Sequence, residues 1–134
     1  MTTRASGTFD VKVVPQVTDG YSEDGTLGRM TLDKELHGDL EGTGRGQMLA
    51  ASTSVKNSAG YVAVERITGT LHGKGGTFML MHTGIMNRGV PGLAITVVPD
   101  SGTGELTGLS GTFNIIRADG KHSYEFDYAI AIEP

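Results

Sequence analysis

The chain is 134 residues long, with 21 glycines, four prolines, no cysteine and a formal charge of −4 at pH 7. The acidic balance excludes the basic surface that nucleic-acid binding requires, and the absence of cysteine excludes disulfide and thiolate chemistry. A chain of this length, without a break in composition, predicts a single domain over residues 1–134 with one core.

The sequence shows no apolar segment of the kind that directs a chain to a membrane. Its first residues lack the apolar stretch of a signal peptide, and no run approaches the ~20 apolar residues that span a bilayer. We therefore expect a soluble, cytoplasmic protein with neither a nucleic-acid nor a membrane partner.

Short alternating runs of β-branched and aromatic residues predict an all-β fold. Residues 6–14 alternate between an apolar face with Phe9 and Val11 and a polar face, and Pro15 is expected to end this strand. Residues 15–26 form the longest polar connection, which we expect to be a surface loop over one end of the fold. Its Tyr21 is either a lid contact or an ordinary exposed side chain.

The second predicted strand, residues 27–37, carries one charged side chain, Lys34, on its apolar face. The third, residues 40–52, follows a turn at Gly38 and Asp39, and its register stays open. A two-residue turn places Glu41, Thr43, Arg45 and Gln47 inside, whereas one extra residue places Gly42, Gly44, Gly46 and Met48 there.

Residues 61–84 are predicted to form two long strands around a turn at Gly73 and Lys74. This turn makes Glu65 face His82, and both side chains lie on the more apolar face of the hairpin. The opposite face carries several threonines together with Met79 and Met81.

The C-terminal part predicts a loop at residues 87–92, a short strand at 93–98 and a plain turn at 99–104. The last hairpin turns at Asp119 and Gly120, which is a strong two-residue turn signal. Its register pairs Phe113 with Phe126, Ile115 with Tyr124, Gly111 with Tyr128 and Arg117 with His122.

These segments amount to eight strands joined by short connections, and they predict one eight-stranded antiparallel up-and-down β-barrel. A two-sheet sandwich is the alternative architecture. In the barrel, the loops at 15–26, 54–60, 87–92 and 118–121 surround one mouth. Its interior holds either packed side chains or one small ligand.

Several motifs in series resemble the bacterial DUF3224 family: HGDLEGTGRGQML, YVAVERITGTLHGKGGTFMLMHTG, VVPDSGTGELTGLSGTF and DGKHSYEFDY. The resemblance covers the chain from about Leu32 onward. It implies membership of the allene oxide cyclase-like barrel superfamily, and hence an eight-stranded antiparallel barrel with an apolar cavity. Because the catalytic residues of allene oxide cyclase and of dirigent-type proteins do not map onto these motifs, the resemblance implies no particular reaction.

An acid and an imidazole on the inner wall are the candidate catalytic residues, Glu65 and His82. A buried carboxylate must be paired, neutral or hydrated, and Lys34 and His82 are its available partners. A carboxyl and an imidazole beside one apolar ligand are suited to proton transfer, which predicts a cofactor-independent isomerase or cyclase. The candidate ligand-binding residues are Lys34, Phe78, Leu80, Phe113, Ile115, Arg117, His122, Tyr124, Phe126 and Tyr128.

Other interpretations stay open at this point. The barrel is alternatively a noncatalytic carrier of a hydrophobic small molecule, or a filled barrel in which Glu65, His82 and Lys34 only satisfy one another. The outer face with Met79 and Met81 is a candidate contact for a homo-oligomer. We expect no metal or other cofactor, because His37 and His72 are predicted at the opposite mouth from His122 and no metal-ligand spacing occurs.

Overall fold

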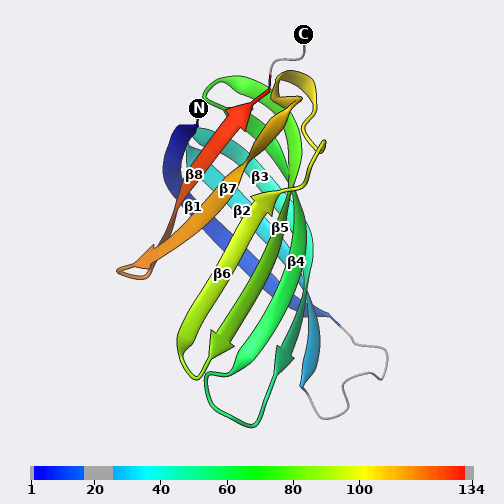
Figure 1. Ribbon diagram of the computed structural model, residues 1–134, viewed down its shortest axis with the longest axis vertical. Coiled ribbons are helices and arrows are strands. Elements are labelled where there is room, and N and C mark those ends of the chain that lie inside the picture. The colour runs from blue at the N-terminus through cyan, green and yellow to red at the C-terminus, as the bar shows by residue number, and fades with distance from the viewer. Residues whose placement is uncertain (1, 17–25, 132–134) are drawn as a thin grey trace.

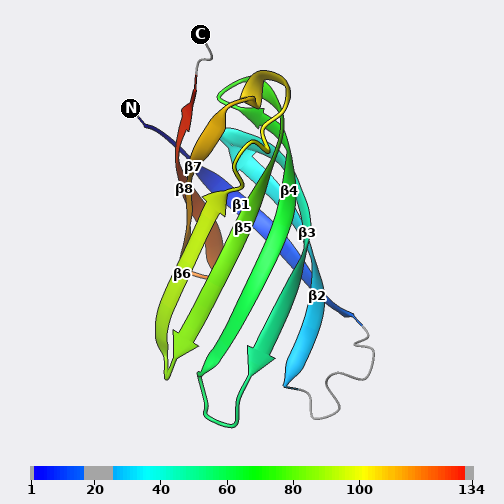
Figure 2. The same ribbon diagram turned by 45° about the vertical axis from the view of Figure 1, so that its right-hand side comes forward.

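The computed structural model describes residues 2–16 and 26–131, which form eight antiparallel strands closed into a barrel (Figures 1 and 2). Neighbouring strands in the sequence pair with one another, and β1 pairs with β8 to close the sheet. The strands are β1 (Thr3–Gln16), β2 (Leu27–Gly38), β3 (Leu40–Ser52), β4 (Ala59–Leu71), β5 (Lys74–Asn87), β6 (Val90–Val97), β7 (Leu109–Ala118) and β8 (Lys121–Ile130).

This architecture confirms the predicted all-β, eight-stranded up-and-down barrel and rules out the two-sheet sandwich. The expectation that Pro15 ends the first strand is wrong. The strand β1 continues through Pro15, which pairs with Met30, because the fixed φ of proline is compatible with extended backbone near a strand end. The predicted lid residue Tyr21 lies outside the described residues.

The β4–β5 hairpin has a different register from the predicted one. Its two turn residues are His72 and Gly73, with φ of 46° and 81°, so that Leu71 pairs with Lys74. The turn therefore lies one residue earlier, and Glu65 faces Leu80 instead of His82. The partners shift by two residues, so every side chain keeps its predicted face.

The registers of two other hairpins follow from their turns. The β7–β8 pairing around Asp119 and Gly120 is confirmed in full, from Arg117 opposite His122 to Gly111 opposite Tyr128. Between β2 and β3, Gly38 has a φ of 110°, and Leu36 pairs with Gly42. This is the alternative with one extra turn residue, which places the glycines of β3 inside the barrel.

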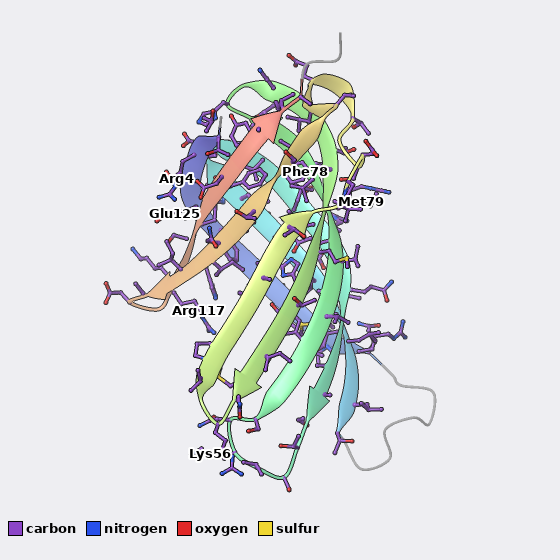
Figure 3. All side chains as sticks on the ribbon, viewed as in Figure 1. Arg4, Lys56, Phe78, Met79, Arg117 and Glu125 are labelled. Atoms are coloured by element: carbon purple, nitrogen blue, oxygen red, sulfur yellow. The ribbon has the colours of Figure 1, made fainter. Side chains whose placement is uncertain are left out.

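One half of the barrel is filled by side chains. Aromatic rings stack across it, with ring centroids of Phe78 and Phe126 at 5.7 Å and of Phe113 and Tyr124 at 5.3 Å. A short 3-10 turn, η1 (Gly104–Leu106), contributes the fully buried Leu106 to the same core. Figure 3 labels Phe78 within this upper half. Apolar burial of this kind supplies most of the stabilising free energy of a small domain.

The barrel wall is weakest between β6 and β7. Only one registered pair joins these strands, Thr96 with Thr112, whereas β4 and β5 pair along their whole length. The ribbons of β6 and β7 diverge toward the tip of the β7–β8 hairpin (Figure 1). The described residues contain no helix that is long and apolar enough to cross a membrane.

Candidate functional site

The other half of the barrel encloses a cavity of about 710 Å³. A volume of this size is typical of small-molecule pockets. The cavity lies toward the predicted mouth, because residues beside the β3–β4, β5–β6 and β7–β8 connections line it. The lining residues are Phe9, Val11, Leu32, Lys34, Met48, Ala59, Gly60, Tyr61, His82, Gly84, Ile85, Met86, Pro91, Gly92, Leu93, Ile115, Arg117 and His122.

The candidate site residues divide between the two halves of the barrel. The cavity is lined by His82 and by four of the candidate ligand-binding residues, Lys34, Ile115, Arg117 and His122. The other six do not line it, because their side chains pack against one another in the filled half: Phe78, Leu80, Phe113, Tyr124, Phe126 and Tyr128. The structure therefore places these six side chains in the core and not around the cavity.

A buried triad of Lys34, Glu65 and His82 lies at the inner end of the cavity. The Lys34 ammonium donates to Glu65 Oε2 over 2.9 Å, and His82 Nε2 hydrogen-bonds the same oxygen. All three residues are almost fully buried, at 6%, 1% and 3% exposure. Glu65 faces Leu80 and His82 faces Ala63, so the two side chains meet diagonally across β4 and β5.

The corrected register gives the two catalytic candidates different depths. His82 lies two pairs nearer the mouth than Glu65 and lines the cavity, whereas Glu65 does not. The carboxylate is thus placed behind the imidazole. Glu65 hydrogen-bonds His82 and does not itself line the cavity, so the imidazole lies at the cavity surface and the carboxylate does not.

The carboxyl of Glu65 is held in its charged form. Burial raises its pKa, but the hydrogen bond from His82 and the positive charge of Lys34 outweigh burial, so the pKa lies below its ordinary value. A carboxylate accepts hydrogen bonds and cannot donate, so Nε2 of His82 carries the proton that they share. The second ring nitrogen, Nδ1, forms no hydrogen bond with any described residue.

Tyr61 is a cavity residue that the sequence analysis did not identify. Its ring centroid lies 6.3 Å from that of His82, and it packs against Gly84. Burial and the charge of Glu65 both raise the pKa of the Tyr61 hydroxyl, so the phenol keeps its proton. Extending the alternation of β4 outward from Glu65 and Ala63 places Tyr61 on the same face, and this signal was present in the sequence.

The opposite end of the barrel contains polar contacts that hold turns together. The Tyr124 hydroxyl accepts from Leu40 N at 3.0 Å and lies 2.9 Å from the carbonyl oxygen of His37. The Tyr128 hydroxyl hydrogen-bonds His72 Nδ1 in the β4–β5 turn. These contacts give both tyrosines a structural role at the β2–β3 and β4–β5 turns.

Two outer surfaces bear on the predicted partners. Among the described residues, Asp10, Glu35 and His37 form an exposed group whose ligand atoms all lie within 4.8 Å of one another. This group could hold a metal ion only on the outside of the barrel, away from the cavity. On the outer face of β4 and β5, Met81 is 49% exposed and pairs with Val64. Association through that face stays a prediction.

Comparison with known proteins agrees with this architecture. Residues 5–128 match the family model described as "Protein of unknown function (DUF3224)", which extends the resemblance to the first strand. The chain is also similar to a crystal structure of a protein of unknown function from the DUF3224 family of Shewanella oneidensis MR-1. The two share 47% sequence identity and a TM-score of 0.94, over 99% of this chain and 100% of that one. The search of curated proteins found no match. The chain therefore belongs to the DUF3224 family.

Proposed function

We propose that the barrel binds a small, largely apolar molecule in its open half and transfers a proton within it. The cavity of about 710 Å³ supports binding, because its lining is mostly aliphatic with a few polar groups at the inner end and the rim. The observation that carries the proposal is the hydrogen bond between His82 and Glu65, formed on a residue that lines the cavity.

The hydrogen bonds of the triad give the two ring nitrogens of His82 different roles. Nε2 is engaged with the Glu65 carboxylate, which Lys34 also contacts. In the tautomer with its proton on Nε2, Nδ1 has a lone pair, and that nitrogen is the candidate general base. Glu65 fixes the tautomer and orientation of the ring, as the acid of a carboxylate–histidine pair does.

Tyr61 supplies a hydrogen-bond donor on the same wall. A phenol that keeps its proton polarises a carbonyl or epoxide oxygen, while His82 removes a proton from a neighbouring carbon and returns it elsewhere. Bonds shift within the substrate, and its atoms and charge are unchanged overall. This places the reaction among cofactor-independent isomerisations and cyclisations, with the apolar wall folding the substrate.

A noncatalytic carrier is the second candidate, and one specific observation favours it. The triad is nearly self-sufficient, because Glu65 Oε2 already holds two donors and satisfies both Lys34 and His82. Such a group is also formed when buried polar side chains only stabilise one another. The carrier and the enzyme share the cavity and differ in whether His82 acts on the occupant.

Binding is tested by filling the cavity from one strand. Ile115 lines the cavity and its neighbour Ile116 is on the outer face, so Ile115→Trp and Ile116→Trp form a matched pair. We expect the uncharged dye N-phenyl-1-naphthylamine to bind the native protein and Ile116→Trp, and to be lost from Ile115→Trp. Equal binding to both variants would contradict a ligand site inside the barrel.

Catalysis is tested with β,γ-unsaturated ketones, whose conversion to conjugated isomers is followed by ultraviolet absorbance. We expect His82→Gln to abolish conversion while dye binding remains. The double variant Lys34→Met with Glu65→Leu replaces the buried ion pair by apolar groups and separates folding from chemistry. We expect it to fold and bind dye but to lose turnover. Turnover that survives in both variants would contradict the catalytic role of the triad, and a native protein that binds dye without converting any ketone would support the carrier.

A further inference from the structure

We propose that the ligand of the cavity is an amphipathic anion, whose negatively charged head group is bound by Arg117 at the rim while its apolar body lies inside. This inference rests on the proposed binding function and adds the chemical class of the ligand.

Among the residues that the structure describes, the cavity lining is apolar with positive charge and without negative charge. Its charged or titratable side chains are Lys34, Arg117, His82, His122 and the phenol Tyr61. None of the described residues that line it is an aspartate or a glutamate. An apolar enclosure with only positive charge at its edges attracts an apolar molecule that carries a negative group.

Two of these groups are already engaged by a carboxylate. Lys34 donates to Glu65 Oε2 over 2.9 Å, and His82 bonds the same oxygen. The ammonium of Lys34 also lies 5.1 Å from the centre of the Phe9 ring, in cation–π range. The inner end of the cavity therefore has little positive charge left for a ligand.

Arg117 is the cation that remains available. It forms no hydrogen bond or ion pair with any residue in the described part of the chain, and it is exposed. Its cross-strand partner His122 lines the same rim and stacks on Phe9, with ring centroids 5.1 Å apart. Arg117 and the stacked imidazole therefore belong to the same part of the rim.

The position of Arg117 matches the weak seam in the barrel wall. It projects from β7 at the level where β6 and β7 are no longer paired, and Figure 3 labels it beside the β7–β8 hairpin. The facing rim on β6 is apolar and consists of Pro91, Gly92 and Leu93. A head group is therefore held on the β7 side of the opening, and the apolar chain passes inward between the two rims.

The guanidinium decides which head groups fit. Its planar donors form two parallel hydrogen bonds with a carboxylate or a phosphate, which a lone alcohol or an uncharged ester cannot reproduce. The shared chemistry is thus an oxyanion on an aliphatic or polycyclic body. The test distinguishes a carboxylate from a phosphate because it uses two ligands that carry these head groups on the same ten-carbon alkyl chain.

The experiment measures displacement of N-phenyl-1-naphthylamine from the complete chain by decanoate, decyl phosphate and 1-decanol at low salt. We expect one or both anions to displace the dye at a concentration roughly tenfold to a hundredfold lower than 1-decanol, the range for a hydrogen bond to a charged group. Arg117→Gln removes this advantage. Lys121→Gln, which removes a cation from the same hairpin outside the cavity lining, keeps it.

Each outcome decides between the two proposals. If the dye and all three ligands fail to bind, the binding function itself fails and this inference fails with it. If 1-decanol binds as tightly as both anions, the cavity is a ligand site but the anion inference is overturned. An advantage for the anions that persists in Arg117→Gln overturns the assignment of Arg117, while loss of the advantage only in that variant supports it.

Discussion

A Cβ atom on Gly44 of β3 would come within 2.8 Å of Glu65 Oε1, so the absence of a side chain at Gly44 makes room for the buried carboxylate. Gly44 pairs with Lys34 on one side and with Ile67 on the other. Oε1 is buried and has no hydrogen-bond partner among the described residues, whereas Oε2 holds two. Gly44 therefore governs the position of the triad.

Gly44→Ala is predicted to displace the Glu65 carboxylate and weaken its contact with His82. The added methyl meets side-chain ends that can move, so we expect a moderate loss of about 1–3 kcal/mol in the free energy of unfolding. Gly46→Ala is the harsher control, because its Cβ would lie 2.1 Å from the backbone oxygen of Val64. Urea denaturation in which Gly44→Ala costs as much as Gly46→Ala would contradict this explanation.

Glu65→Gln is predicted to destabilise the barrel and to change its response to acid. Loss of the carboxylate leaves the Lys34 charge buried without a counter-charge, at an expected cost of about 3–5 kcal/mol at neutral pH. The folded pKa of Glu65 lies below the ordinary value of 4.5, so the native group adds stability above that pH and loses it as pH falls toward the folded pKa.

The acid dependence is measured by denaturant unfolding between neutral pH and pH 3. We expect the native protein to lose stability over this range more steeply than Glu65→Gln does. Glu35→Gln is the control, because Glu35 is exposed on the outer face and its loss leaves the steep dependence in place. Parallel acid profiles for the native protein and Glu65→Gln would show that this carboxyl is not the group responsible.

Tyr124→Phe is predicted to lower stability without affecting ligand binding. The hydroxyl bonds the backbone of His37 and Leu40 at the β2–β3 turn, and its loss leaves buried backbone groups unpaired at a cost of about 1–3 kcal/mol. Because Tyr124 does not line the cavity, the dye should bind the variant as it binds the native protein. A thermal unfolding curve unchanged by the substitution would contradict the proposed stabilisation of the β2–β3 turn by the Tyr124 hydroxyl.

Tyr61→Phe is predicted to lower turnover while leaving stability nearly unchanged. Tyr61 is half-buried at the mouth, and the structure gives its hydroxyl no hydrogen bond within the described part of the chain, so stability should change by less than about 1 kcal/mol. Turnover of the ketone probes should fall because the donor to the substrate oxygen is lost. Full activity in Tyr61→Phe would mean that another group polarises the substrate.

The sequence predicts the faces of the strands better than their partners. Alternation alone places Glu65, His82 and Lys34 inside, and the structure confirms that placement. The exact partner of Glu65 depends on which two residues turn the hairpin, and His72 adopts a positive φ that glycine usually adopts. A shift of two residues preserves the faces and still changes which of the two candidates lines the cavity.

The open and filled halves of the barrel could not be derived from strand patterns. The same inward alternation runs through Phe113, Ile115 and Arg117, yet the first is packed in the core and the other two line the cavity. What separates them is the divergence of β7 from β6, which depends on the closure of the whole sheet. The register of β3 could not be chosen from the sequence for a related reason. It depends on whether the turn at Gly38 contains one additional residue.

We propose that Glu65 fixes His82 with its proton on Nε2 and leaves Nδ1 as the candidate base. Long-range ¹H–¹⁵N correlation spectra of the imidazole, recorded at neutral pH, measure this directly. We expect a protonated Nε2 and an unprotonated Nδ1 for His82, with the preference lost in Glu65→Gln. A proton on Nδ1, whether on that nitrogen alone or on both, would overturn the assignment of Nδ1 as the base.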